Sequence, residues 1–126
     1  MKKLNLYDFE LYQKSRELSK IAWRIYIKLP RDIQYKTGGQ FLESADSVQA
    51  NVAEGFGRYH YKDKLNFHFY ARGSLIESLS WSEVLLEREL IGIEIQMEFT
   101  ELANTISMMN NAYIRHLWDQ SRSPRP

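Results

Sequence analysis

The chain has 126 residues, a net charge of +1, 44% hydrophobic residues and no cysteine. This length fits one domain with one core, and the apolar content is too high for a disordered chain. The missing cysteines exclude disulfides and thiolate metal sites, and no stretch approaches the about 20 apolar residues of a membrane span.

Lys2 and Lys3 resemble the charged start of a signal peptide. The apolar run that a signal peptide needs does not follow, because Asn5, Asp8 and Glu10 interrupt it. We therefore expect a soluble, cytoplasmic protein with no membrane partner.

Two amphipathic helices are predicted in the first half, over residues 8–29 and 37–55. Asp8 is the expected N-cap of the first, and Pro30 ends it. Its apolar face comprises Leu11, Ser15, Leu18, Ala22, Ile25 and Leu29, and that of the second comprises Phe41, Ala45, Val48 and Val52. The second helix is also rich in small residues, which would let another helix approach closely.

Two longer helices are predicted in the second half, over residues 62–90 and 94–119. The expected buried stripe of the third comprises Leu65, Phe69, Arg72, Ile76, Leu79, Glu83, Leu86 and Leu90. That of the fourth comprises Ile95, Phe99, Leu102, Ile106, Met109, Tyr113 and Leu117. Gly73 lies within the third helix, where it costs about 1 kcal/mol against alanine, so we expect a packing reason for it.

Four helices joined by short connections predict an all-α protein, an antiparallel up-down-up-down four-helix bundle. We assign residues 1–120 to this single domain and residues 121–126 to a disordered tail that cannot continue a helix. Several tyrosines and tryptophans fall off the predicted stripes, among them Tyr26, Tyr70, Trp81 and Trp118. A helix that is apolar on more than one face favours burial on more than one face, which self-association would supply.

The sequence contains no constellation typical of catalysis. None of the three histidines follows a glutamate by three positions, as a dimetal bundle requires; the residues three before His60, His68 and His116 are Gly57, Leu65 and Tyr113. Residues 55–57 resemble a phosphate loop faintly, but a helix rather than a strand precedes them, so we interpret them as a helix stop. We expect no catalytic residues, no cofactor, no metal and no enzymatic activity.

Two polar runs face each other across the predicted turn between the second and third helices. Residues 51–58 read Asn-Val-Ala-Glu-Gly-Phe-Gly-Arg, and residues 71–77 read Ala-Arg-Gly-Ser-Leu-Ile-Glu. We predict a structural polar cluster of Asn51, Glu54, Arg58 and Arg72, in which Arg72 pairs with Glu54 and fixes the register of the two helices. The alternative is an anion-binding pocket at Arg58 and Arg72.

Positive charge is concentrated in the first predicted helix. Residues 1–30 hold seven basic and three acidic side chains. Arg16, Lys20, Arg24 and Lys28 step by four and form one stripe, whereas Lys14 lies aside. Such a stripe is either an ordinary solvated face or a contact for phosphates. We see no aromatic base-stacking platform in this sequence, so base-specific recognition is not predicted.

The two polar runs resemble a known family, the small four-helix-bundle proteins encoded within intervening sequences of bacterial 23S rRNA genes. The resemblance also includes the opening of the first helix, Phe9–Trp23, and residues 69–77. It implies ring-shaped homopentamers and no enzymatic activity. The chain is similar as well to the accessory protein of diversity-generating retroelements, in which a basic surface is linked to RNA and reverse transcriptase. It departs from the family at Leu42-Glu43, where relatives are often basic, and at Asp46, where they are commonly apolar.

Two functions from different classes follow. The first is a non-enzymatic, homo-oligomeric helical module, a pentamer by resemblance, that binds RNA or a nucleoprotein partner through Arg16, Lys20, Arg24 and Lys28. The second is an assembly scaffold that binds only protein, including copies of itself. Dependence of binding on phosphate would distinguish them.

Overall fold

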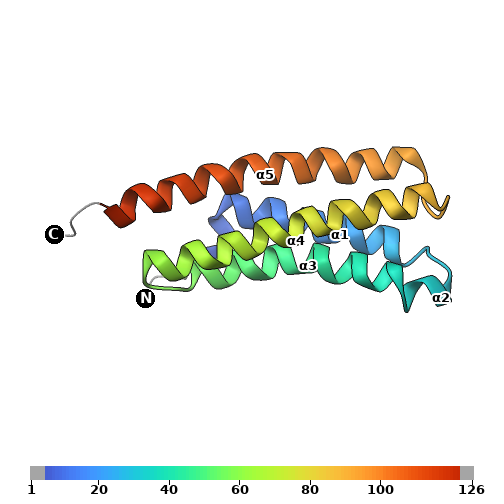
Figure 1. Cartoon of the computed structure of the whole chain (residues 1–126), viewed down its shortest axis with the longest axis horizontal. Helices are drawn as coiled ribbons and strands as arrows, with labels where there is room; N and C mark the ends of the chain where they lie inside the picture. The colour runs from blue at the N-terminus through green and yellow to red at the C-terminus, as the bar shows by residue number, and fades with distance from the viewer. Residues whose placement is uncertain (1–4, 123–126) are drawn as a thin grey trace.

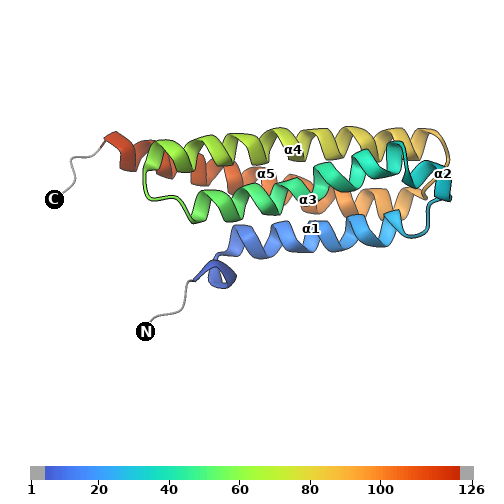
Figure 2. The ribbon, with the colours of Figure 1, turned by 90° about the horizontal axis from the view of Figure 1, so that it is seen from below.

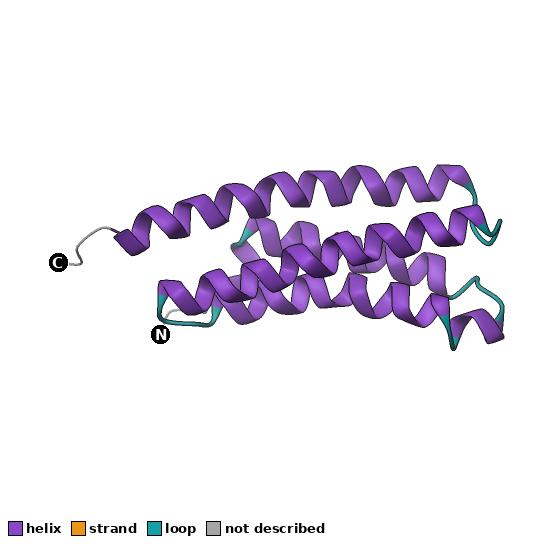
Figure 3. Cartoon of the chain, viewed as in Figure 1, coloured by secondary structure: helices purple, strands orange, loops and turns teal. Residues whose placement is uncertain are grey.

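A computed structural model describes residues 5–122, and Figure 1 shows an all-helical bundle. The elements are η1 (Leu6–Asp8), α1 (Glu10–Tyr26), α2 (Arg31–Gln34), α3 (Thr37–Phe56), α4 (Tyr61–Glu87) and α5 (Ile93–Arg122). Figure 3 shows helices joined by short loops, with no strand among the described residues. The predicted all-α class is confirmed.

The four long helices pack as an antiparallel bundle in which each helix touches its neighbours in chain order. The contact between α3 and α4 is the most extensive; α4 packs on α5, and α1 packs on both α3 and α5. Figures 1 and 2 show the helices side by side, with the C-terminal end of α5 projecting beyond α4. This is the predicted up-down-up-down arrangement, with α1 and α4 on opposite corners.

Several helix ends differ from the predicted ones. Asp8 lies in the short η1 turn, and the residue before α1 is Phe9, without a side-chain cap. The connection after α1 contains an unpredicted turn, α2, whose Gln34 Nε2 donates to Tyr26 O at 3.0 Å. At the other end α5 continues to Arg122, so the expected tail begins at least two residues too early. Residues 123–126 of that tail lie outside the described part.

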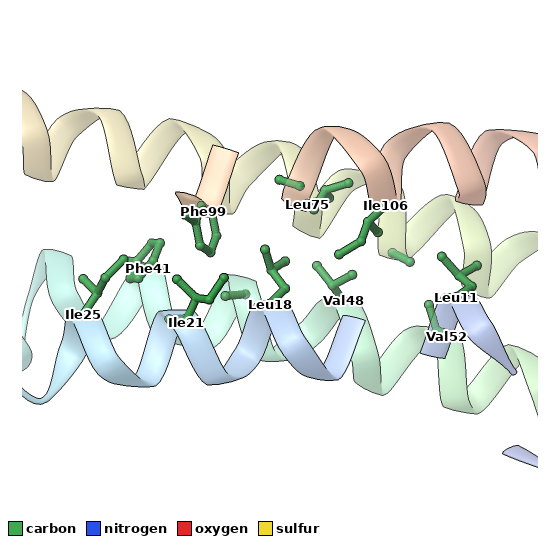
Figure 4. Close-up of a cluster of buried hydrophobic side chains, with 14 of the residues drawn as sticks. Leu11, Leu18, Ile21, Ile25, Phe41, Val48, Val52, Leu75, Phe99 and Ile106 are labelled. Atoms are coloured by element: carbon green, nitrogen blue, oxygen red, sulfur yellow. The ribbon is translucent and has the colours of Figure 1, made fainter. Parts of the chain in front are cut away.

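The core lies along the whole inner face of α1 and α3. The faces predicted for these two helices are confirmed, because all their named residues are buried. Figure 4 shows Leu18 and Val48 meeting the side chains of Leu75 and Ile106 from the opposite pair of helices. The rings of Phe41 and Phe99 lie 5.1 Å apart between centroids and close one end of this core.

The stripe predicted for α4 is wrong. The buried residues of this helix are Leu65, His68, Ala71, Leu75, Ser78, Ser82 and Leu85, whereas Arg72, Ile76 and Glu83 are exposed. Small hydroxyl residues can lie inside because they bond within their own helix. Ser78 Oγ donates to Leu75 O at 2.8 Å, and Ser82 Oγ donates to Leu79 O at 2.7 Å. Their small volume lets α4 approach its neighbours closely.

His68 joins three helices at the centre of this buried face. Its Nδ1 lies 2.8 Å from Asn110 Oδ1 of α5, and Asn110 Nδ2 donates to His68 O at 3.0 Å. Because the amide nitrogen is the donor in the second bond, Oδ1 accepts from a protonated Nδ1 in the first. Nε2 has no hydrogen-bond partner among the described residues and faces Gly55 of α3. A Cβ on Gly55 would lie 3.2 Å from the imidazole ring and 3.2 Å from Phe67 Cβ.

Of the two glycines in residues 55–57, Gly55 is the one that is closely packed. α3 ends at Phe56 as predicted, but Gly57 has φ −78°, so no left-handed residue ends this helix. The only described residue with positive φ is Glu89, at 59°, just after α4. The C-terminus of α3 is capped from α4 instead: Lys64 Nζ donates to Gly55 O at 3.2 Å and to Phe56 O at 3.1 Å.

Replacing Gly55 with alanine should destabilise the protein. The added Cβ would press on the rigid imidazole ring and on Phe67 Cβ, and overpacking of this kind costs about 1–3 kcal/mol, more than the gain of about 1 kcal/mol in helix propensity. Gly57→Ala is the matched control, because its Cβ would meet only ordinary contacts of 3.7 Å. Urea unfolding of both variants measures the difference. Equal midpoints would contradict a packing role for Gly55.

Stability should fall as the pH drops below about 6.5. Burial lowers the pKa of His68 below its usual 6.5, opposed by the Asn110 bond and reinforced by the charge of Lys64. The unfolded chain therefore binds a proton in this range that the folded chain refuses, and the free energy of unfolding falls by up to about 1.4 kcal/mol per pH unit. His68→Gln should flatten this slope in urea unfolding at several pH values. The exposed His60→Gln should leave it unchanged; an unchanged slope in His68→Gln would refute the assignment.

Candidate nucleic-acid interface

Three of the four predicted cationic residues lie on one exposed face of α1, and the fourth, Lys28, follows in the turn after this helix. Arg16, Lys20, Arg24 and Lys28, here called the basic stripe, are all exposed, and the buried residues of α1 occupy the opposite face. Figure 2 shows α1 at the margin of the bundle. Three steps of four residues give the stripe a length of about 18 Å. The exposure predicted for these four side chains is thus found in the structure, whereas their binding role stays a prediction.

The four cations are not equally free. Arg24 forms a two-pronged ion pair with Glu98 of α5, with nitrogen–oxygen distances of 3.1 and 3.5 Å. Arg16 Nη1 donates to Tyr12 Oη at 2.7 Å and keeps its charge uncompensated. Among the described residues, neither Lys20 nor Lys28 forms a salt bridge. The stripe thus holds three unpaired cations and one that is shared with a carboxylate.

A hollow of about 450 Å³ lies beside the C-terminal half of the basic stripe. Its walls come from the end of α1, the turn after α4 and the beginning of α5: Arg24, Ile25, Lys28, Leu90, Ile91, Gly92, Glu94, Ile95 and Glu98. The two glutamates offset the two cations at this end. Positive potential is therefore strongest toward the N-terminal half, around Arg16 and Lys20.

An exposed aromatic side chain accompanies the basic stripe. Trp23 is 53% exposed, and its ring stacks on Tyr26 with 5.7 Å between centroids and 25° between planes. Lys20 precedes it by three residues and Ile27, also exposed, follows it by four, so the three share a helix face. The sequence pattern gave Trp23 no role among the cations. The helical spacing of Trp23 from the buried residues of α1 would have placed it beside the cationic side chains.

The predicted polar cluster is only partly correct. Glu54 and Arg58 do come together, at 3.1 Å, but on the surface and within one turn. Arg58 also lies over the ring of Phe67, 4.6 Å from its centroid. The predicted Arg72–Glu54 pair is wrong: Arg72 is exposed and lies over Phe69 of its own helix.

The side chain of Asn51 forms its hydrogen bond within its own helix, α3. Its Nδ2 donates to Ser47 O at 2.9 Å, so it does not satisfy groups of an ion pair between helices. The register of α3 against α4 is instead set by Gly55 packing on His68. The surface pair of Glu54 and Arg58 contributes little to it, since exposed i,i+4 pairs are worth about 0.3–0.5 kcal/mol.

The outward side of α4 carries a second unusual surface. Tyr70 is 56% and Ile76 is 62% exposed, and Gly73 lies between them with no atom within 4 Å of a Cβ built on it. We call these three residues the α4 outer face. The packing reason expected for Gly73 is therefore absent within the described part of this chain.

Two further findings concern the described residues. No group of three histidine, aspartate or glutamate side chains is arranged to hold a metal ion between residues 5 and 122. None of the described helices combines the length and the apolar character that crossing a membrane requires.

Comparison with known proteins places the chain in a family. Residues 7–112 match the 23S rRNA-intervening sequence protein family. No curated protein matches. A similar solved structure is a protein of unknown function from the S23 ribosomal protein family of Bacteroides thetaiotaomicron, 23% identical, with a TM-score of 0.78 over 82% of this chain and 97% of that one. At this identity the likeness supports the fold alone. The chain is a member of the 23S rRNA-intervening sequence protein family.

Proposed function

We propose that this protein is a non-enzymatic, homo-oligomeric RNA-binding module of the cytoplasm. The observation that carries the proposal is the exposed basic stripe, in which Lys20 and Lys28 are unpaired and Arg16 keeps its charge. Ammonium and guanidinium groups at the surface bind phosphates mainly by releasing counterions, without reading sequence. Among polyanions we choose RNA, because the accessory protein of diversity-generating retroelements, which the sequence resembles, has a basic surface linked to RNA.

Self-association would strengthen such a contact. Two or three phosphate contacts in one subunit bind weakly at physiological salt, but a ring repeats them at a high effective concentration. The resemblance noted in residues 51–58 and 69–77 implies five subunits. The exposed apolar side chains of the bundle, including the α4 outer face, supply surface for the subunit contacts.

The RNA proposal predicts a salt-dependent affinity that depends on the unpaired lysines. Lys20→Glu plus Lys28→Glu should weaken binding of single-stranded RNA at least tenfold at low salt. The slope of log affinity against log salt should fall by about 1.4 for each subunit in contact, since each lost phosphate contact removes about 0.7. Fluorescence anisotropy across a salt series measures both. Arg24 is left unchanged because its replacement by glutamate would place two carboxylates together.

The matched control carries the same charge change elsewhere. Lys62 and Arg115 are exposed on α4 and α5, outside the basic stripe. Lys62→Glu plus Arg115→Glu should weaken binding much less than the stripe variant does. An equal loss in both variants would point to net charge alone, and no binding by the natural protein at low salt would reject RNA as the ligand.

A protein-only scaffold is the second candidate, and the α4 outer face favours it. A glycine flanked by exposed Tyr70 and Ile76 suits the close approach of a second helix. Since Gly73 has no close neighbour here, the helix that would use this space belongs to another molecule. This candidate needs no contribution from the basic stripe.

A bulky side chain at Gly73 should therefore disrupt assembly without unfolding the subunit. Gly73→Leu meets open space within the chain, so the urea midpoint of the subunit should not fall. Light scattering should show a smaller species than the natural protein gives. Asn104→Leu, on the exposed side of α5, is the control for added apolar surface. An unchanged mass in Gly73→Leu would exclude this face from the subunit contact, and a natural protein of 15.0 kDa in solution would reject self-association.

A further inference from the structure

The arrangement of Trp23 within the basic stripe narrows the kind of RNA that this surface fits. The indole is 53% exposed and stacks on the ring of Tyr26, with 5.7 Å between the ring centroids and 25° between the ring planes. Tyr26 is half-buried, and its carbonyl accepts a bond from Gln34 of α2 at 3.0 Å. The indole is thus supported from one side by a half-buried ring, which reduces the entropy lost when a ligand stacks on it.

The surroundings of Trp23 are cationic. Lys20 and Arg24 precede and follow it, and Arg16 lies one turn before Lys20 on the same exposed face. An aromatic ring beside a row of cations is the combination by which proteins hold single strands: bases stack on the ring while the backbone follows the charges. A base paired in a duplex has both of its faces occupied by neighbours and cannot use the ring.

We propose that Trp23 is a stacking platform for an unpaired base, and that the basic stripe therefore binds single-stranded RNA in preference to duplex. The inference rests on the proposed RNA-binding function and adds the class of ligand. Base stacking tolerates every base, so the preference concerns strandedness and carries little sequence information.

Two other occupants of this surface are less well supported. A protein partner would account for an exposed tryptophan, but lysine is depleted at protein interfaces, and here Lys20 and Lys28 flank the ring at both ends. An anionic membrane surface would attract the same charges. The apolar face that α1 would have to insert is, however, buried against α3 and α5.

The test compares three variants with a single-stranded RNA of mixed sequence and with its duplex. The natural protein should bind the single strand more tightly. Trp23→Ala should lose about five- to a hundredfold in affinity for the single strand, the range for one lost stack, and little for the duplex. Trp23→Phe should retain most of the preference. Trp118→Ala is the matched control, since Trp118 is a 46% exposed tryptophan on α5 near Arg122.

The outcomes separate this inference from the proposed function. No binding of either RNA by the natural protein rejects the proposed function itself. Equal binding of both RNAs, unaffected by Trp23→Ala, leaves that function standing and overturns the inference. If light scattering gave a different oligomer mass for Trp23→Ala than for the natural protein, Trp23 would be a residue of the subunit contact. Binding of phosphatidylserine vesicles that depends on Trp23, with no effect on RNA, would make the surface a membrane contact; either result overturns the inference.

Discussion

The contact on which the rest of the bundle depends is the packing of His68 between Gly55 and Asn110. One residue comes from each of α3, α4 and α5, and the two hydrogen bonds of 2.8 and 3.0 Å are directional. A slip of α4 by one residue would leave a buried imidazole and a buried amide without partners, which costs several kcal/mol. Aliphatic contacts elsewhere tolerate small shifts, so this contact selects the register.

That register decides which chemistry reaches the surface. Once Ala71 and Leu75 face inward, Gly73 lies on the opposite side of α4, and Arg72 and Ile76 are exposed beside it. At the surface, the ion pair of Arg24 with Glu98 connects α1 to α5. The polar contacts of this core are thus between neutral side chains. The charged side chains of the basic stripe remain at the surface, where a ligand can reach them.

Much of the fold could be predicted from the sequence, and the failures have two physical origins. The faces of α1 and α3 follow hydrophobic periodicity, so Leu18 and Val48 were placed correctly, and with them the exposed basic stripe. In α4 the buried residues include His68 and Ser78, and the exposed ones include Ile76, so a hydrophobicity stripe selects the wrong face. The predicted pairing of Arg72 with Glu54 was wrong for the same reason, because Arg72 was assigned to the buried stripe and is exposed. The Arg24–Glu98 pair joins residues 74 positions apart and depends on how two helices align, which no local pattern encodes.

The surface available to a polyanion is smaller than the sequence suggests. Glu94 and Glu98 of α5 stand beside the C-terminal half of the basic stripe, so a phosphate there meets carboxylates as well as Lys28. The uncompensated positive potential lies around Arg16 and Lys20, next to Trp23. A surface of this size holds only a few phosphates, and the free energy it supplies does not sustain a stable complex from one copy. Under the proposed function, RNA binding would therefore depend on self-association, because repetition of the same small contact would raise the affinity.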